Sequence, residues 1–342
     1  MADLESMWQR FRVDLETELR FAVGSASLPM YDMMRYHLGW TDAQGNPQST
    51  TVGKRLRPIL CLLTCQSVGG DWRQALPAAA AVELVHNFSL IHDDIQDASP
   101  ERRGRATVWH IWGQPQAINV GDGMHALALS SLLRLEEGGV PHHKVVRAAR
   151  ILGEASLKLC EGQYLDISYE NRLDIGINDY LEMIGSKTAA LFRCSLEIGA
   201  LLGTADESLL ARLKLFGHDL GMTFQVHDDM LSIWGDERTT GKPNTSDILM
   251  KKKTLPIVYA LEKSRGADRE KLWQIYQKKT VTQIDVEDVM KILNRLDAQG
   301  FVQGTSEKFF RQAISELNTA DIPQSAKEEL KIIATFLLRR QY

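Results

Sequence analysis

Two acidic clusters are the residues of this sequence best suited to chemistry. The first contains Asp93, Asp94 and Asp97, and the second contains Asp228 and Asp229. Aspartates one helical turn apart share a face and repel each other. Mg²⁺ offsets such repulsion, because it binds one or two carboxylates together with phosphate oxygens. A single acidic run is usually a solvated helix end, but two runs at the ends of apolar helices predict metal sites for a phosphorylated ligand.

Basic residues complement these clusters. The segment 53–58, Gly-Lys-Arg-Leu-Arg-Pro, begins a predicted helix, where backbone N–H groups and the helix dipole favour anions. The other basic residues of interest lie in loops or interrupt apolar runs: Arg102, Arg103, Lys187, Lys242 and Lys252. Each one alone fits a surface charge. Together with the aspartates they predict two anion sites, one rich in metal ions and one rich in arginine.

Apolar residues at helical spacing must position these groups. They recur at i, i+3, i+4 and i+7 nearly throughout the chain. The spacing predicts helices over 57–68, 77–97, 121–135, 145–160, 177–202, 209–234, 255–263, 286–299 and 307–317, and a last one from 326. Because long helices are joined by short loops without a break in composition, we expect one all-α domain over residues 1–342. The long polar segment 235–247 is expected to be a mobile loop over the site.

Composition argues against several classes of protein. The 40 Lys and Arg residues against 44 Asp and Glu give a net charge of −4, which leaves no electrostatic footprint for nucleic acid. No apolar run is long enough to form a transmembrane segment. The first residues carry acids and no apolar run, which predicts no signal peptide and a cytoplasmic location. The four cysteines include no C-x-x-C pair, so they are expected to be buried thiols.

The order of these motifs closely resembles that of the all-trans isoprenyl diphosphate synthases. The family's D-D-x-x-D-x-x-x-x-R-R-G motif matches residues 93–104, and its G-K-R-x-R-P element matches residues 53–58. Its remaining elements match in family order: K-T at 187–188, Q-x-x-D-D at 225–229, G-K at 241–242, D at 247 and K-x-T-L-P at 252–256. The resemblance implies the isoprenoid synthase fold, a single-domain bundle of about ten or more helices around a central hydrophobic cavity. It also implies a homodimer.

The activity that the resemblance implies is a Mg²⁺-dependent prenyl transfer, in which an allylic diphosphate condenses with isopentenyl diphosphate. The metal ligands would be Asp93, Asp94, Asp97, Asp228 and Asp229, holding about three Mg²⁺, or Mn²⁺ in their place. The residues that would bind isopentenyl diphosphate are Lys54, Arg57, His86 and Arg103. Those for the leaving diphosphate are Arg102, Lys187 and Lys242, with Lys252 as a further substrate-binding residue. The allylic cation would be stabilised by Lys187, Thr188 and Gln225.

Product length depends on residues that precede the first cluster. Phe88 and Ser89 lie five and four residues before Asp93, about 6–7.5 Å along a helix at ~1.5 Å per residue. In the family that the sequence resembles, one aromatic residue here, without an insertion in the first motif, is associated with twenty-carbon products. We therefore expect geranylgeranyl diphosphate as the product. A farnesyl or longer polyprenyl diphosphate remains open.

The second acidic motif leaves another reaction class open. It ends in Ser232 where the family usually has aspartate, and the series Asp228, Ser232 and Asp236 also resembles a metal motif of class I terpene cyclases. A cyclase ionises a single diphosphate, so the second set of cations favours the condensing enzyme. A non-catalytic binding protein is the remaining alternative, and it does not explain why acidic and basic residues gather at two complementary places.

Overall fold

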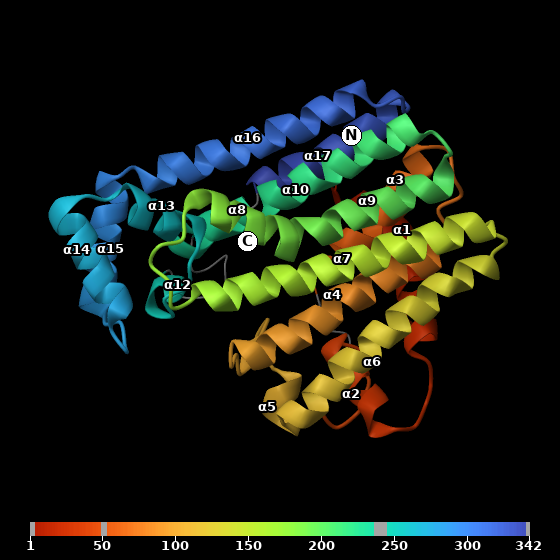
Figure 1. Ribbon diagram of the computed structural model, residues 1–342. Coiled ribbons are helices and arrows are strands. Elements are labelled where there is room, and N and C mark those ends of the chain that lie inside the picture. The colour runs from red at the N-terminus through yellow and green to blue at the C-terminus, as the bar shows by residue number, and fades with distance from the viewer. Residues whose placement is uncertain (1–3, 49–52, 236–244, 340–342) are drawn as a thin grey trace. The chain divides into compact units, whose positions relative to one another are not determined.

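The structure, a computed structural model, describes residues 4–48, 53–235 and 245–339. Most of these residues lie in helices, and their one sheet is the hairpin of β1 (Glu101–Arg102) and β2 (Arg105–Ala106) (Figure 1). The predicted all-α class is therefore confirmed. None of the described helices combines the length and the apolar character needed to cross a membrane.

Packing divides the chain into two compact units that alternate along the sequence. Unit 1 comprises Met1–Ser156, Cys194–Lys214 and Asp321–Glu329. Unit 2 comprises Leu157–Arg193, Leu215–Ala320 and Leu330–Tyr342. Four helices contribute residues to both units: α7 (His142–Tyr169), α9 (Ala190–Gly203), α10 (Glu207–Trp234) and α17 (Gln324–Arg339). A single domain over residues 1–342 stays a prediction.

Unit 1 is built around α4 (Leu76–Gln96), which is apolar on nearly every side. Pro77 suits its first turn because the proline ring fixes φ, and the alanines that follow are strong helix formers. Residues 78–85 are all buried, and Glu83 is the polar side chain among them. The other elements of unit 1 are α1 (Leu4–Val23), α2 (Pro29–His37), α3 (Leu56–Ser67), α5 (Val108–Trp112), α6 (Gln114–Leu133) and the 3₁₀-helix η1 (Arg134–Glu136).

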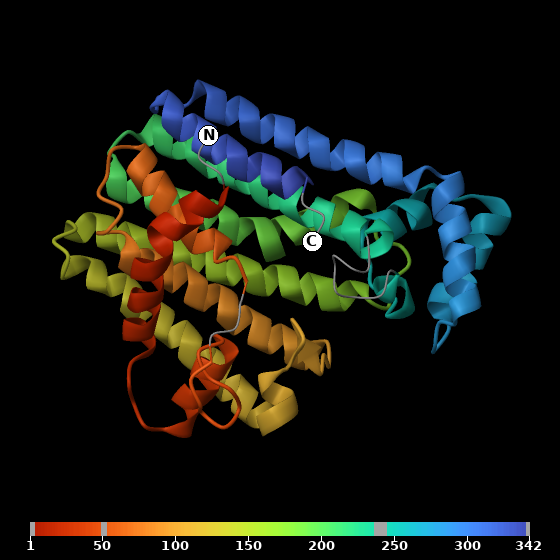
Figure 2. The ribbon, with the colours of Figure 1, turned by 180° about the vertical axis from the view of Figure 1, so that it is seen from behind.

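Neighbouring helices cover α4 on several sides. It packs against α1, α3 and α6, and both views show α6 running beside it (Figures 1 and 2). A helix that is apolar all round is stable only inside a core. The aspartates at the C-terminus of α4 are therefore carried by a rigid element.

Two apolar clusters pack the described part of unit 2. Its own elements are α8 (Ile177–Ile184), the π-helix η2 (Gly185–Ala189), α12 (Ser246–Leu249), α13 (Leu255–Lys263), α14 (Gly266–Gln277), α15 (Gln283–Arg295) and α16 (Ala298–Thr319). One cluster joins α13 with α14 and α15, which lie side by side in Figures 1 and 2. The other joins α8, α10 and α13 around Tyr180, Val226 and Leu255. Val226 comes two residues before Asp228, so this cluster supports the part of α10 that carries the second acidic motif.

Five predicted helices differ from the structure in more than their terminal residues. The predicted helix over 121–135 covers only the later part of α6 and runs into η1, and that over 145–160 is only the middle of the longer α7. The predicted helix over 286–299 is confirmed as far as Arg295 and wrong beyond it, because the chain breaks at Asp297. Asp297 has a left-handed φ of 49° and caps α16 by accepting a hydrogen bond from the Gly300 N–H. The predicted helix over 307–317 is only the middle of the longer α16. The predicted helix over 177–202 is interrupted by η2, since five residues adopt a wider π-helical turn.

Candidate active site

The first acidic cluster lies at the C-terminus of α4, where neighbouring aspartates have different environments. Asp94 is 2% exposed and accepts a 2.8 Å hydrogen bond from Arg102 Nε. Burial raises the pKa of Asp94 to about 6, against the opposing effect of Arg102. Asp93 is 20% exposed, and Asp97, which ends the helix, is half-buried. Asp93 and Asp97 are therefore the carboxylates of this cluster that a metal ion can reach, while Asp94 holds Arg102.

The two arginines after this cluster lie on a tight hairpin. Strands β1 and β2 pair in antiparallel register, so Arg103 and Gly104 form the two-residue turn. Both turn residues have positive φ, 53° and 71°, as a type I′ turn requires. Glycine adopts this conformation without strain, but arginine does not. Strained residues gather at functional sites, so the conformation of Arg103 supports a role for its side chain.

The hairpin brings Arg103 to the segment that precedes α3. Gly53 has a φ of 80°, and a Cβ placed on it would lie 2.8 Å from Arg103 Nη1. The guanidinium therefore rests against the Gly53 backbone, next to the exposed Lys54. A Cβ at residue 53 would push the guanidinium away, so glycine allows this close approach, which joins two basic segments that are far apart in the sequence.

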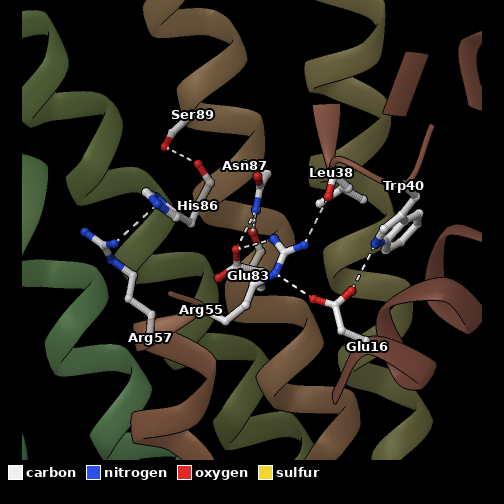
Figure 3. Close-up of polar contacts among 9 residues, drawn as sticks. All are labelled: Glu16, Leu38, Trp40, Arg55, Arg57, Glu83, His86, Asn87 and Ser89. Carbon is white, nitrogen blue, oxygen red and sulfur yellow. Dashed lines mark hydrogen bonds and ion pairs between the residues drawn. The ribbon is translucent and has the colours of Figure 1, made fainter. Parts of the chain in front are cut away.

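Arg57 and His86 extend the basic region from α3 to α4 (Figure 3). Arg57 Nη1 lies 3.3 Å from His86 Nε2. A guanidinium only donates, so His86 Nε2 accepts and the imidazole is neutral. Burial, and then Arg57 and Arg103, lower the pKa of His86 well below its ordinary value. Lys54, Arg57, His86 and Arg103 thus lie close together within unit 1, and below we call this set the basic region.

A cavity of about 450 Å³ opens beside the hairpin, and its lining includes His37, Asp94, Arg102 and Arg103. Burial, and then Arg102 and Arg103, lower the pKa of His37 to about 3, so this imidazole is neutral. Ligand pockets for small molecules start at about 300 Å³. The cavity therefore has the size and the charge for a small anion.

The second acidic cluster lies on α10, and its two aspartates again differ. Asp228 is exposed, whereas Asp229 is 3% exposed. Asp229 accepts hydrogen bonds from Tyr180 OH, from the Leu255 N–H (3.0 Å) and from Gln225 Nε2 (3.1 Å). Burial raises the pKa of Asp229 to about 7 in spite of these bonds. Asp229 therefore joins α8, α10 and the N-terminus of α13, and Asp228 is the aspartate that a metal ion can reach.

The π-helix η2 presents the Lys187-Thr188 pair. Thr188 Oγ1 donates to Gln225 Oε1 over 2.8 Å, and Gln225 in turn donates to Asp229. Lys187 Nζ lies 2.6 Å from Asp166 Oδ2 on α7. π-helical turns occur frequently at functional sites. The structure thus brings these predicted residues of unit 2 into one hydrogen-bonded group.

Other predicted residues are not part of either group. Lys242 and Asp236 lie outside the described residues, as does the 236–244 part of the predicted mobile loop 235–247. Lys252 is exposed, and its backbone N–H donates to the Asp247 carbonyl over 2.8 Å. That bond fixes the backbone just before α13.

The two residues predicted to limit product length have different neighbours. Phe88 is 6% exposed, and its ring centroid lies 4.7 Å from that of His125 on α6. Ser89 is half-buried and donates from Oγ to the His86 carbonyl over 2.8 Å. Phe88 therefore packs between α4 and α6, and its part in setting product length stays a prediction.

Sequence reasoning missed three residues that lie at these groups: Asp166, Tyr180 and His37. The sequence contains an indication only for Asp166, namely Gly162, a glycine one turn earlier on α7. A Cβ on Gly162 would lie 2.2 Å from Lys187 N, so this glycine lets α7 approach η2 and lets Asp166 reach the lysine. Tyr180 and His37 are an ordinary aromatic residue and an ordinary histidine in amphipathic helices, and only the fold reveals their positions.

Comparison with known proteins identifies the family. Residues 45–293 match the model of the Polyprenyl synthetase family. The chain belongs to this family. It is 40% identical over 321 residues to the geranylgeranyl diphosphate synthase of Mycobacterium tuberculosis, covering 93% of this chain and 90% of that protein. It is 36% identical over 315 residues to the (2E,6E)-farnesyl diphosphate synthase of Mycobacterium bovis, covering 91% of this chain and 86% of that protein.

The fold agrees with this family. The crystal structure of a polyprenyl synthetase from Streptomyces coelicolor matches with a TM-score of 0.91 and 37% sequence identity, over 98% of this chain and all of that chain. The resemblance read from the motifs is therefore confirmed. The chain is a chain-elongating prenyltransferase of a family that uses divalent metal ions.

Proposed function

We propose that the chain condenses an allylic diphosphate with isopentenyl diphosphate to give geranylgeranyl diphosphate. The observation that carries the proposal is the basic region, which is anchored at His86. Asp93 follows His86 by seven residues, about 10 Å along α4 at ~1.5 Å per residue. A single diphosphate is too short to span that distance. Two separate diphosphates, one at the carboxylates and one at the basic region, fit this spacing.

Mg²⁺ is the metal ion that the carboxylates fit best. In the described parts of the chain no group of three or more His, Cys, Asp or Glu side chains would hold a metal by itself. Mg²⁺ suits such a site, because it is bound by one or two carboxylates and substrate phosphate oxygens. Asp93, Asp97 and Asp228 would hold the ions, about three in number as the family resemblance implies. When bound, they neutralise the diphosphate and act as Lewis acids on the leaving group.

The reaction needs no reactant beyond the two substrates. The bond between the allylic carbon and the diphosphate oxygen breaks, and the double bond of isopentenyl diphosphate attacks the allylic cation to form a carbon–carbon bond. A proton then passes to the released diphosphate. Arg102 and Lys187 would bind the leaving diphosphate, and Thr188 would stabilise the cation. Because Thr188 donates its hydroxyl proton to Gln225, its oxygen lone pairs remain available to face positive charge.

Product analysis tests this proposal. The chain should be incubated with isopentenyl diphosphate, Mg²⁺ and dimethylallyl, geranyl or farnesyl diphosphate in turn. We expect inorganic diphosphate and a twenty-carbon prenyl diphosphate, and Lys54→Ala should raise the KM for isopentenyl diphosphate about ten- to a hundredfold. A main product of fifteen carbons would correct the length only. Cyclic hydrocarbon formed without isopentenyl diphosphate would overturn the proposal.

A terpene cyclase fits the site less well, although its motif would use Ser232 as a metal ligand. Ser232 Oγ donates to the Asp229 carbonyl of its own helix over 3.0 Å, a common contact of serine in helices. That bond leaves the lone pairs of the hydroxyl oxygen available, so it does not decide between the two enzymes. A cyclase ionises a single diphosphate and does not account for the basic region, so the condensing enzyme remains the function that the site supports best.

The homodimer is part of this proposal. Ile118, Leu129 and Leu133 are exposed, and their spacing places them on one face of α6. Apolar side chains gathered on one exposed face mark interaction surfaces, and a second copy of this chain would cover them. Sedimentation should show a dimer that Leu129→Glu converts to a monomer. A monomeric wild-type chain would refute the assignment.

A cytoplasmic location also remains a proposal, which cell fractionation would test.

A further inference from the structure

We propose that Arg55 is a positioning residue of the isopentenyl diphosphate site. Its guanidinium, held by Glu83 and Glu16, fixes the backbone that carries Lys54 and Arg57. The inference rests on the proposed function, which assigns Lys54 and Arg57 to that substrate. Neither Arg55 nor its two carboxylate partners belongs to the set of residues that would touch the ligand.

Arg55 lies in the middle of the basic segment but differs from its neighbours. It has a left-handed conformation, with φ 46° and ψ 40°, and it is the residue that precedes α3. This conformation is strained for a residue with a Cβ, so the surroundings must hold it in place. Its side chain is 8% exposed, whereas Lys54 is exposed. Arg55 therefore points into unit 1 at the position where Lys54 reaches solvent.

Each nitrogen of the Arg55 guanidinium has an acceptor (Figure 3). Nη1 donates to Glu83 Oε1 over 2.8 Å, Nε donates to Glu16 Oε1 over 3.0 Å, and Nη2 donates to the Leu38 carbonyl over 3.3 Å. Glu83 belongs to α4, Glu16 to α1, and Leu38 is the residue that ends α2. One side chain thus ties the start of α3 to three other helices.

The acceptors are themselves held by other groups (Figure 3). Glu16 Oε2 accepts from Trp40 Nε1 over 2.9 Å, and Glu83 Oε1 accepts from Asn87 Nδ2 over 2.9 Å. Asn87 Nδ2 also donates to the Glu83 carbonyl over 2.7 Å, one turn away on α4. The carboxylates therefore cannot follow Arg55 if it moves. The contact restrains the arginine instead of adapting to it.

The charge of Arg55 is also committed to these carboxylates. Burial alone would lower the pKa of Arg55, but Glu83 and Glu16 outweigh it and raise the pKa. The guanidinium therefore stays charged, and two negative groups face its single positive charge. A diphosphate would have to compete with both of them. Arg55 is thus poorly suited as a substrate ligand, although the same six-residue segment supplies two.

The consequence is a pre-organised binding segment. Lys54 precedes the fixed residue directly, and Arg57 follows it by two residues in the first turn of α3. His86, the partner of Arg57, lies on α4 three residues after Glu83. Because both sides of the basic region are anchored to the Arg55–Glu83 contact, its donors are ordered before the substrate arrives. Pre-organisation of this kind increases affinity by removing the cost of ordering side chains on binding.

Steady-state kinetics of paired variants tests the inference. Arg55→Met removes the cation and leaves the buried Glu83 carboxylate unpaired, and an unpaired buried charge can unfold a protein. The double variant Arg55→Met/Glu83→Gln is therefore compared with it, because it removes both members of this ion pair. We expect the KM for isopentenyl diphosphate to rise about tenfold or more in these variants. The KM for the allylic substrate and kcat should stay within about twofold, the pattern of a lost binding interaction. Arg55→Lys keeps the charge without the fork of donors and should fall between wild type and Arg55→Met.

The controls separate positioning from general stability. Arg10→Met removes another ion pair of unit 1, that of Arg10 with Glu329, and should change the melting temperature without changing either KM. A double variant that folds and has the wild-type KM for isopentenyl diphosphate overturns the inference. So does one that weakens both substrates equally, because that pattern indicates loss of the fold. If Lys54→Ala leaves the KM for isopentenyl diphosphate unchanged, the proposed site itself is wrong, whatever Arg55 does.

Discussion

Gly162 on α7 is a position where one added methyl group would act directly on the chemistry. A Cβ there would lie 2.2 Å from Lys187 N and 2.6 Å from Lys187 Cα. Ordinary contacts begin at 3.4 Å, so η2 or α7 would have to retreat by 3.4 − 2.2 = 1.2 Å. The atoms in the way belong to the backbone, which cannot turn aside as a flexible side chain can. Gly162→Ala should therefore displace the Lys187-Thr188 pair.

The size of the effect follows from this displacement. Overpacking a core costs about 1–3 kcal/mol, and Gly→Ala in a helix returns up to about 1 kcal/mol. The free energy of unfolding should therefore fall by up to about 2 kcal/mol. A misplacement of about 1 Å in a catalytic group costs about a hundredfold in rate. We therefore expect kcat to fall by up to about a hundredfold. The reason is that Lys187 is proposed to bind the leaving diphosphate and Thr188 to stabilise the cation.

Urea denaturation and steady-state kinetics measure the two effects, and Gly153→Ala on the same helix is the matched control. A Cβ on Gly153 would meet no atom within 4 Å, so that variant should gain up to about 1 kcal/mol and keep its activity. If the two variants behave alike, α7 does not approach η2 closely and the reasoning fails. If Gly162→Ala loses stability but keeps kcat, the position of Lys187 and Thr188 does not limit the reaction.

The remaining predictions concern four single residues. Asp93→Asn should abolish turnover with little effect on stability. Asp229→Asn should instead lower the free energy of unfolding by about 1–3 kcal/mol, because it disturbs three buried hydrogen bonds. Steady-state kinetics and urea denaturation of both variants test these expectations. Ser89→Phe should shift the main product from twenty carbons to fifteen, because a bulky side chain one turn before Asp93 would fill the space for the last five-carbon unit. Chromatography of the dephosphorylated products measures this shift. An unchanged product would mean that Ser89 lies away from the growing prenyl chain. Burial lowers the pKa of Lys253 from 10.5 to about 8, so the unfolded chain binds that proton more tightly and stability should rise with pH between these values. The rise should be smaller in Lys253→Met, and an identical rise in both proteins would contradict the assignment.

The sequence predicts the helices that depend on local pattern. The central α4 was expected over 77–97 and runs from Leu76 to Gln96, because its alanines, its proline and its apolar run all favour one helix. The same kind of pattern, with Met7, Phe11, Leu15, Leu19 and Val23 buried at every fourth position, also exists in α1, although charged residues between them obscured it. The expected helices omit α1, α2, α5, α12 and α14. For α1 the physical rule holds, and the omission comes from an incomplete reading of its apolar pattern.

Other features depend on contacts that no local pattern contains. The π-helix η2 coincides with the place where Gly162 meets the Lys187 backbone, and these residues lie on different elements. The break between α15 and α16 depends on the left-handed conformation of Asp297 and the cap that it forms. Residue type also does not reveal that Arg55 is buried while Lys54 is exposed, since both are basic residues in one short segment.

The aspartate pairs show why a count of acidic residues overstates the charge of this site. Successive residues on a helix point about 100° apart, so adjacent aspartates face different surroundings. Asp94 is neutralised by Arg102, and burial raises the pKa of Asp229 to about 7. In the proposed metal site, Asp93, Asp97 and Asp228 would then supply most of the negative charge that faces a ligand. Three carboxylates cannot balance several Mg²⁺ ions, so the substrate diphosphate must supply much of the compensating charge. Metal and allylic substrate should therefore bind cooperatively, and Mg²⁺ alone should bind weakly.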